Sequence, residues 1–389
     1  MLLLLSVYNI PNNSLYGIQT RSRANSIGYL VLYMTTYMNR FITNLLGLYG
    51  METRKVQVTG GSTYTVSIPK SWANDNGVSA GCTVEFYPEG DSLFMTPAGD
   101  DDRTEGTLDI TKLKETELIR AVTTMYVSGF DIIRLESARI SNDQRRTIRE
   151  ATQSLVGLEV LEETKGEIVI RDLLDSSELS IHNAVTRMRL IASSMLEDAL
   201  LALRDLDRDL AADVIQRDDD VDRLWMVVSR IFRATLRTPK ATEELGLPRE
   251  VCFDYHSSAR QLERIGDHAT KIAHISLDIE QEVPEEALDA IDELHSEVVT
   301  VIDGGMDALF TDDSEEATRL ANDVRERVRD VDATARGIDE LLRELDPARA
   351  QLVGRIVDSV SRTADYGGNI AETALQKAAP TPGSSSNRE

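Results

Sequence analysis

Cysteine is nearly missing from this chain of 389 residues, and the two that occur are far apart. Cys82 and Cys252 are separated by 170 positions, and neither lies in a CxxC context. Disulfide-bonded small domains and thiolate zinc sites need clustered cysteines, so both are excluded as the basis of this fold. We interpret both cysteines as small buried side chains.

Basic residues are scarce as well. The sequence has 66 Asp and Glu against 42 Lys and Arg, which gives a formal net charge of −24 and a pI near 4.7. Such a chain is not a general nucleic-acid coat, because non-specific affinity depends on neutralising phosphates. Eight of the basic residues are lysines, so arginine dominates. Excess carboxylate with arginine preferred over lysine is typical of a halophilic protein, and we expect a cytoplasmic one.

Residues 1–50 contain no Asp or Glu and three arginines, so they carry +3 and leave −27 for residues 51–389. Their apolar stretch, residues 27–49, is interrupted by Asn39 and Arg40, and each flank is shorter than the roughly 20 residues that span a bilayer. No basic segment precedes Leu2 to make a signal peptide. We expect no stable membrane insertion and interpret residues 1–50 as an over-extended gene start. A disordered tail or a weakly membrane-associating segment is the alternative.

Signatures of catalysis are absent too. The sequence has no P-loop and no GxSxG, so neither phosphoryl transfer nor a nucleophile elbow is indicated. Di-iron enzymes built on helical bundles use Glu-x-x-His. No glutamate stands three residues before any of the five histidines, which are His182, His256, His268, His274 and His295. We therefore expect no enzyme, and a carboxylate-bridged metalloenzyme is the disfavoured alternative.

Short alternating segments begin after Met51. Residues 54–68 predict a β-hairpin around a Gly60-Gly61 turn. Pro69 is suited to begin a short helix that Gly77 ends. The segments TVEFY and SLFMT predict a second hairpin around residues 88–91. A ββαββ unit of under about fifty residues buries little core alone and needs a second copy.

This segment resembles the SpoVT/AbrB family of swapped-hairpin domains, whose dimers bind DNA, over about residues 53–97. The most specific part runs from the Gly-Gly turn through Ile68-Pro69-Lys70 to the spacing of Gly77 and Gly81. The resemblance implies a homodimer formed through residues 51–98. It also implies DNA contacts from the basic residues at the family's DNA-facing positions, which are Arg54, Lys55 and Lys70.

Those three are the only basic residues of segment 51–98, against five acidic ones, so its net charge is −2. Non-specific DNA binding should therefore be weak, although specific readout needs only a few base contacts. The alternative is that Arg54 and Lys55 are ordinary solvated charges of a domain that only dimerises.

Residues 99–176 predict a small α+β connector. It opens with the acidic linker GDDDRTEG and continues in the order α-β-α-β-β. The helices are expected near residues 110–126 and 141–155. The strand DIIRLES lies between them, and a hairpin crosses Lys165-Gly166. Nothing in this segment has catalytic spacing, so we expect a structural part or a surface for a partner or ligand.

Residues 177–379 predict nearly continuous helix. Apolar residues recur at spacings of three and four, as in VTRMRLIASSMLEDALLAL, which marks amphipathic bundle helices. Residues 212–222 align with residues 322–332 at an offset of 110, and ERIGD aligns with SRTAD at an offset of 98. Two related three-helix bundles, at 177–281 and 282–379, explain both offsets. Residues 380–389 are expected to form a disordered tail.

Two carboxylates stand four residues apart in QLERIGDHATKIA. Residues i and i+4 share one face of a helix, so Glu263 and Asp267 can reach one cation together. RDDDVDRL followed by LERIGDHATKIA resembles the PhoU family of phosphate-uptake regulators, all-α proteins of two tandem three-helix bundles with metal-binding carboxylate motifs. The resemblance implies four metal ligands in the first bundle: Asp218, Asp222, Glu263 and Asp267. An all-oxygen set suits Mg, Mn or Fe, and Zn is also considered.

Two further interpretations stay open for this motif. His268 could add a nitrogen ligand, but we expect it to pack or to face solvent. In a chain this acidic, carboxylates four residues apart also occur on solvated or salt-bridged helix faces.

The second bundle departs from the motif. The repeat places Val328 opposite Asp218 and Ser361 opposite Glu263, so Asp332 and Asp365 alone remain as weaker candidates. A second pair, Glu326 and Asp330, is out of register on the helix. The sequence therefore predicts one competent metal site and a second that is weak or absent.

The sequence as a whole predicts a mainly α fold: two tandem three-helix bundles, preceded by a small swapped-hairpin β domain and an α+β connector. By resemblance, the protein is a non-catalytic regulator of phosphate uptake that acts through a phosphate transporter, a signalling protein or DNA. Direct transcriptional control is one form of this hypothesis. The alternative is a protein-binding adaptor in which the N-terminal domain only dimerises.

Overall fold

The computed structural model describes residues 52–99, 103–173, 180–279 and 282–380. The chain divides into two compact units, Met1–Val84 and Glu85–Glu389. The interpretations of residues 1–50 and of the C-terminal tail from residue 381 onward concern positions outside the described residues.

The first unit contains the predicted hairpin and short helix. Strand β1 (Gln57–Thr59) pairs antiparallel with β2 (Thr63–Thr65), and α3 (Lys70–Asp75) follows. Gly60 and Gly61 have φ of +66° and +83°, the left-handed region that a glycine adopts at little cost. The Gly-Gly turn predicted from the sequence is thus confirmed.

This unit buries almost nothing by itself. Every described residue from 52 to 84 is exposed or half-buried. The exposed apolar side chains include Val58 and Tyr64, which pair across the hairpin. Cys82 is also exposed, so the prediction that both cysteines are buried is wrong for Cys82 and right for Cys252. The physical reason is that a single copy of this unit has no core in which to place a side chain.

The predicted second hairpin is confirmed. Strand β3 (Val84–Glu89) begins at the boundary between the units and pairs with β4 (Ser92–Pro97) in a two-stranded sheet. Beyond it lies the α+β connector, whose sheet has the order β5-β6-β8-β7. Its strands are β5 (Glu105–Asp109), β6 (Ile132–Glu136), β7 (Leu158–Glu163) and β8 (Glu167–Asp172).

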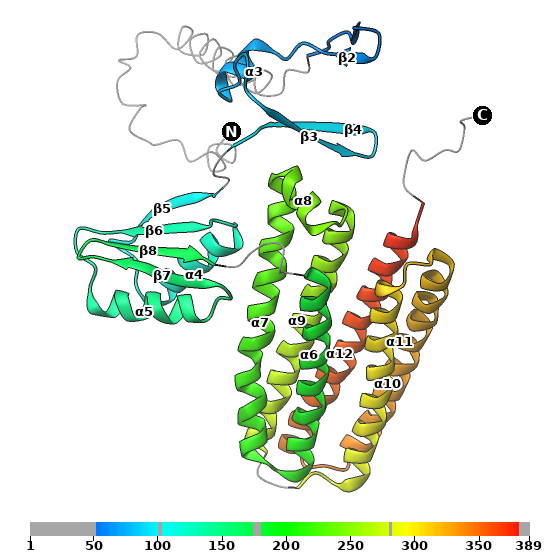
Figure 1. The fold of residues 1–389 in the computed structure, drawn as a ribbon. Coiled ribbons are helices and arrows are strands. Elements are labelled where there is room, and N and C mark those ends of the chain that lie inside the picture. Colours follow the sequence, from blue (N-terminus) through cyan, green and yellow to red (C-terminus); the bar gives the residue numbers. More distant parts are fainter. Residues whose placement is uncertain (1–51, 100–102, 174–179, 280–281, 381–389) are drawn as a thin grey trace, which may run out of the picture. The chain divides into compact units, whose positions relative to one another are not determined.

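The helices of the connector are α4 (Glu115–Val127) and α5 (Asn142–Gln153), which pack over Ile133, Leu135 and Ile170 of the sheet (Figure 1). Strand β5 runs parallel to β6, and the other pairs are antiparallel. The sequence prediction missed β5 and began its helix five residues too early. Strand β5 was missed because its first and last residues are acidic, so its composition resembles that of a linker. It becomes a strand only through its pairing with β6.

In the described part of the chain, six long helices form the two bundles (Figure 1). The first contains α6 (Ile181–Asp205), α7 (Arg208–Arg237) and α9 (Arg249–Asp278). The second contains α10 (Glu285–Phe310), α11 (Ser314–Leu342) and α12 (Pro347–Ala378). The short helix α8 (Pro239–Leu245), which the sequence analysis did not foresee, begins at the Pro239 signal. The predicted fold class, two tandem three-helix bundles after β and α+β parts, is confirmed.

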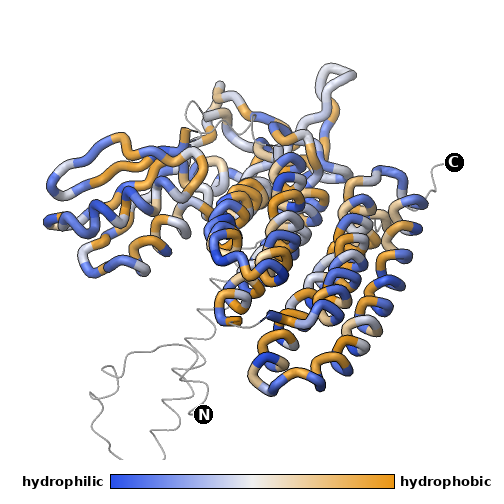
Figure 2. Tube along the Cα trace, turned by 90° about the horizontal axis from the view of Figure 1, so that it is seen from below, coloured by the Kyte–Doolittle hydropathy of each residue, from blue (hydrophilic) through white to orange (hydrophobic). Residues whose placement is uncertain are grey.

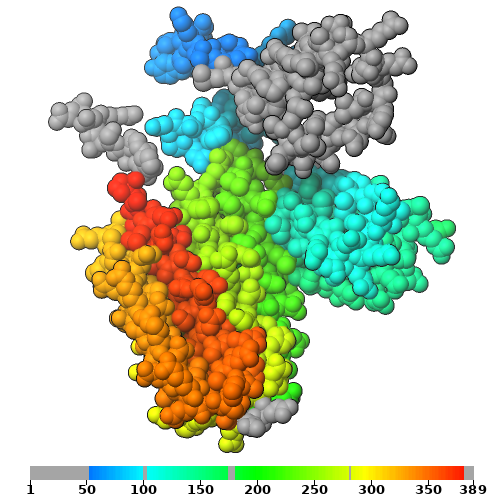
Figure 3. All heavy atoms as spheres, turned by 180° about the vertical axis from the view of Figure 1, so that it is seen from behind, coloured from blue at the N-terminus to red at the C-terminus, as the bar shows by residue number. Residues whose placement is uncertain are grey.

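The two bundles share one apolar core. Helix α9 packs against α6, α7 and α12, so it is central. Seen from behind, α12 (red) lies between α11 (orange) and the green helices of the first bundle (Figure 3). Hydrophobic and hydrophilic residues alternate along every bundle helix (Figure 2), as an amphipathic helix requires. None of the helices in the described ranges is long and apolar enough to span a bilayer.

The connector is docked on α7 by a buried arginine. The Arg230 guanidinium donates to the carbonyls of Tyr126 and Phe130 at 2.7 and 3.1 Å. It also pairs with Asp131 at 2.9 Å and with Asp172 at 2.7 Å, and the Asp172 side chain is 6% exposed. Buried charges are tolerated when they are paired in this way, and removing one partner strands the other.

We expect Arg230→Met to loosen this docking and to lower the free energy of unfolding by about 3–5 kcal/mol, because it breaks the buried ion pair with Asp172 and the hydrogen bonds to Tyr126 and Phe130. Hydrogen exchange should quicken in α4 and in the C-terminal third of α7. The matched control is Arg233→Met, an exposed arginine one turn along the same helix, for which a change under about 0.5 kcal/mol is expected. Equal exchange in wild type and Arg230→Met would contradict the assignment.

Candidate metal centre in the first bundle

Two helices of the first bundle that pack against each other carry the four predicted ligands. Glu263 and Asp267 lie on α9, and Asp218 and Asp222 lie on α7, which packs against it. Glu263 is only 8% exposed because its neighbours Leu262 and Ile265 face the core. The α7 pair is half-buried and Asp267 is exposed, so the site has a buried end and an open end.

Gly266 sets the closeness of the two helices at this point. A Cβ placed on Gly266 would lie 3.5 Å from the Val221 side chain and 3.7 Å from Asp218 Oδ1. The Asp218 carboxylate therefore lies close to the α9 backbone at Gly266. Carboxylates from both helices thus share one small region.

The electrostatics of this region are those of crowded, partly buried acids. Burial, and then repulsion by Asp218 and Asp267, raises the pKa of Asp222 to about 6. Burial, and then repulsion by Asp267, raises the pKa of Glu263 to about 7. The same two causes raise the pKa of Asp218. Each carboxylate makes its neighbours harder to ionise, which is the condition that a cation relieves.

One basic group already faces the cluster. Arg260, one turn before Glu263 on α9, forms an ion pair with Glu263 Oε1 through its Nη1. Glu263 Oε2 is buried and has no hydrogen-bond partner in the described part of the chain. A buried carboxylate oxygen that accepts no hydrogen bond lowers the stability of the fold. A ligand that binds this oxygen would therefore be favoured.

The residues fit a hard cation by their chemistry, although not by their present positions. Carboxylate oxygens are the donors that Mg²⁺, Mn²⁺ and related ions prefer. Within the described ranges, however, no three Asp, Glu, His or Cys side chains are placed so that all could bind one ion. A cation would have to draw the four carboxylates inward by side-chain rotation. His268 has its Nε2 3.3 Å from Tyr366 Oη of α12, an alternative to metal contact.

The equivalent region of the second bundle is built differently. A Cβ on Gly368 would lie 3.1 Å from a Val328 methyl group, so hydrocarbon fills the place that Asp218 has in the first bundle. Asp365 pairs with Arg362 at 3.2 Å, and Asp332 is exposed. Glu326 and Asp330 are exposed as well.

The predicted DNA-contact residues lie in the first unit and in the open. Arg54, Lys55 and Lys70 are all exposed. The Arg54 guanidinium forms an ion pair with Glu52, which lowers the positive charge available at this end of the hairpin.

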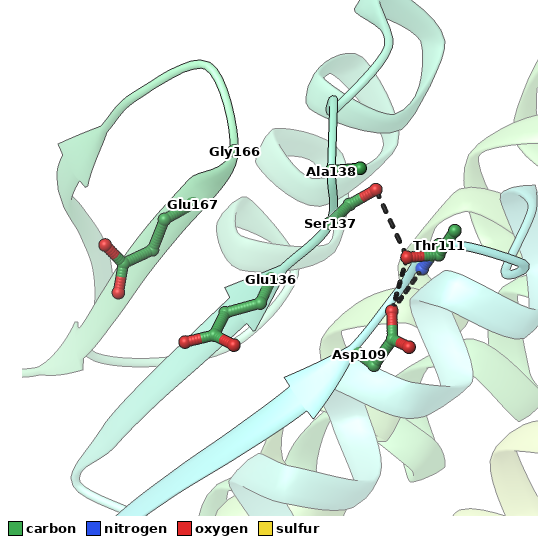
Figure 4. Close-up of a pocket in the computed structure, with 7 residues that line it drawn as sticks. All are labelled: Asp109, Thr111, Glu136, Ser137, Ala138, Gly166 and Glu167. Atoms are coloured by element: carbon green, nitrogen blue, oxygen red, sulfur yellow. Dashed lines mark hydrogen bonds between the residues drawn. The ribbon is translucent and has the colours of Figure 1, made fainter.

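An open depression lies in the connector, at the carboxyl ends of the parallel strands β5 and β6. This open depression of about 510 Å³ is lined by Asp109, Thr111, Glu136, Ser137, Ala138, Gly166 and Glu167. Figure 4 shows that Thr111 donates hydrogen bonds to Asp109 Oδ1 and to Ser137 Oγ. Hydrogen bonds from Thr111 lower the pKa of Asp109, and Arg134 neutralises Glu167 at 3.0 Å. The lining includes none of the predicted site residues.

The sequence analysis missed Arg260 and Trp225 as members of the carboxylate region. The Arg260 guanidinium lies over the Trp225 ring, 5.5 Å from its centre. Spacing could have found both residues, since Arg260 precedes Glu263 by three and Trp225 follows Asp222 by three.

Comparison with known proteins supports both resemblances. Residues 185–276 match the PhoU domain, and residues 57–102 match the family described as "Antidote-toxin recognition MazE, bacterial antitoxin". The chain therefore contains a PhoU domain, and a MazE/AbrB-like domain precedes it.

Similar proteins are known from several bacteria. Two Caulobacter vibrioides proteins, each named "Phosphate-specific transport system accessory protein PhoU homolog", are 36% identical over 98 residues, which is 25% of this chain. The match spans 39% of the length of those relatives. PhoU from Pseudomonas aeruginosa aligns over 50% of this chain and 93% of its own, with a TM-score of 0.44 and 24% identity. PhoU from Streptococcus pneumoniae covers 50% and 91%, with a TM-score of 0.41 and 20% identity.

One more perturbed carboxylate lies on α9, outside the cluster. Asp254 is 7% exposed, and burial raises its pKa to about 6, against an opposing effect of Lys377. The folded state thus holds this proton more tightly than the unfolded state, in which an aspartate titrates near pH ~3.9. The stability linked to Asp254 is present below about pH 4 and is lost as the pH rises to about 6.

Asp254→Asn should therefore stabilise the protein at pH 7.5 by about 1–3 kcal/mol, and the gain should vanish near pH 4. Thermal unfolding of both proteins across this pH range measures the difference. Glu293→Gln, at an exposed position of α10, serves as the control with no such trend. A gain that is the same at both ends of the range would show that ionisation is not its cause.

Proposed function

We propose that this protein is a non-catalytic regulator of phosphate uptake that binds a metal ion in its first bundle and acts in the cytoplasm. The observation that supports it most is the cluster of mutually repelling carboxylates on α7 and α9, within the segment that matches the PhoU domain. The relatives named as phosphate-specific transport accessory proteins supply the process.

Asp218, Asp222, Glu263 and Asp267 would hold the ion. Bound there, a divalent or trivalent cation supplies countercharge for a region that otherwise repels itself. The chain's own part is to keep the carboxylates apart on two packed helices, with Glu263 Oε2 buried and without a donor among the described residues. Asp332 and Asp365 are the weaker candidates, because Val328 and Ser361 replace the other two donors.

The N-terminal part supports dimerisation. The apolar side chains of the β1–β2 hairpin are exposed in one copy, with Tyr64 at 76% and Val58 at 63%. A second copy of the same hairpin would cover them and provide the missing core. Arg54, Lys55 and Lys70 would then be presented twice, as a symmetric reader of DNA requires.

A protein-binding adaptor is the second candidate. In that form the hairpin only dimerises, and the bundles contact a phosphate transporter or a signalling protein. The negative charge of segment 51–98 and the Glu52–Arg54 ion pair favour this candidate.

Metal binding is tested by titrating metal-free protein with Mg²⁺ or Mn²⁺ in a calorimeter. We expect Asp267→Asn to weaken metal binding by at least about tenfold. Loss of a group that only hydrogen-bonds to a metal ligand already lowers metal affinity by about tenfold or more, and a direct ligand should matter at least as much. Asp365→Asn, the same substitution at the equivalent position of the second bundle, is the matched control and should bind like wild type. Equal affinity of Asp267→Asn and wild type would remove the site.

DNA binding is tested by gel shift with the gene's own upstream DNA over a range of salt concentrations. We expect the pair Arg54→Ala/Lys55→Ala to weaken a specific shift by at least about tenfold through lost base and phosphate contacts. The pair Lys112→Ala/Arg139→Ala removes the same charge from exposed positions of the connector and should leave the shift unchanged. If wild type shifts no fragment, the adaptor is the better account.

A further inference from the structure

Arg260 makes two contacts at once on the α7–α9 surface. Its guanidinium pairs with Glu263 Oε1 and also lies over the Trp225 ring, 5.5 Å from the ring centre. Arg260 and Glu263 differ in their freedom to move. The Arg260 side chain is 43% exposed and can move into water, whereas the Glu263 side chain is 10% exposed and cannot.

Trp225 is the first of a series of neighbouring rings on α7 and α9. Its ring centre is 4.8 Å from that of His256 at an interplanar angle of 36°. The His256 ring lies 4.6 Å from Phe232 at 30°. Arg260 is thus the outermost layer of an aromatic stack that α7 and α9 build between them. Removing a cation from the face of a tryptophan changes the electrostatic environment of the indole.

The charges make Arg260 and an added cation competitors. The Arg260 guanidinium pairs with Glu263 Oε1, so its positive charge offsets part of the repulsion inside the cluster. A divalent ion at Glu263 Oε2 would supply the same countercharge with twice the charge, and it would repel the Arg260 guanidinium that pairs with the neighbouring Oε1. Since Arg260 is the mobile partner, it is the group that leaves.

We infer that Arg260 is a positioning residue of the carboxylate cluster, an internal counter-ion that holds Glu263 while no cation is bound and leaves it when one enters. This inference rests on the proposed metal site. When Arg260 leaves, the Trp225 ring loses the guanidinium that lies over it. Cation binding therefore changes the α7–α9 surface around Trp225.

The test uses the full chain with Trp72→Phe, which leaves Trp225 as the single tryptophan. Mg²⁺ is the probe, since it does not quench fluorescence as a paramagnetic ion does. Binding is measured by calorimetry and the Trp225 emission in parallel, in this background and in the same background with Arg260→Gln. Arg264→Gln is the matched control: the same charge is removed from the same helix, but Arg264 lies over Tyr366, 5.7 Å from that ring centre, and acts on Glu263 more weakly than Arg260 does.

We expect Mg²⁺ to change the Trp225 emission with the midpoint found by calorimetry. Arg260→Gln should bind Mg²⁺ about fivefold more tightly, the effect of removing one competing ion pair, and should lose most of the emission change. Arg264→Gln should stay within about twofold of the background and keep the emission change. Arg260→Lys retains the countercharge, so its affinity should stay near that of the background.

Each other outcome overturns the inference in a distinguishable way. Weaker Mg²⁺ binding in Arg260→Gln would make Arg260 a support for Glu263 and not a competitor. An unchanged emission response in that variant would remove the link to Trp225. Both results leave the metal site in place, whereas no Mg²⁺ binding to the background protein would overturn the site and this inference together.

Discussion

The rest of the structure depends on the burial of α9 among three other helices. Because α9 packs against α6, α7 and α12, its apolar faces leave little surface for polar groups, and Glu263 is pulled to 8% exposure. Gly266 then lets α7 approach until the Asp218 carboxylate touches the α9 backbone region. Like charges are thereby held together by hydrophobic packing, and Arg260 compensates them in part. The packing stabilises a local electrostatic arrangement that is unfavourable on its own.

The second bundle shows the same helical frame without that arrangement. Val328 fills the position of Asp218 and packs close to Gly368. Ser361 replaces Glu263, and Asp365 is satisfied by Arg362 at 3.2 Å. Apolar contact and a surface ion pair stand where the first bundle has mutually repelling carboxylates. The two bundles, which pack together along α9 and α12, therefore differ in charge. Carboxylates of the first bundle repel one another and are only partly compensated, whereas the corresponding positions of the second are apolar or paired.

The sequence predicted the helices and hairpins well, because apolar periodicity, prolines and the Gly60-Gly61 turn are local signals. Spacing of four placed Glu263 and Asp267 on one face, and the repeat offset identified Val328 and Ser361 as departures. Strand β5 was missed since its strand character comes from pairing with β6, which no local pattern encodes. The contacts of Arg260 with Trp225 and of Arg230 with Asp172 were also missed, because each joins two different elements that only tertiary packing brings together. Exposure of Cys82 could not be foreseen without knowing that a single copy of its unit has no core.

Anomalous diffraction from crystals grown with Mn²⁺ tests the central claim most directly, since it locates the ion without mutation. The account predicts a peak between α7 and α9, within bonding distance of carboxylates from both Asp222 and Glu263, with Arg260 turned away. It predicts no comparable peak between α11 and α12. A map with no peak in the first bundle, or with equal peaks in both bundles, would contradict the account.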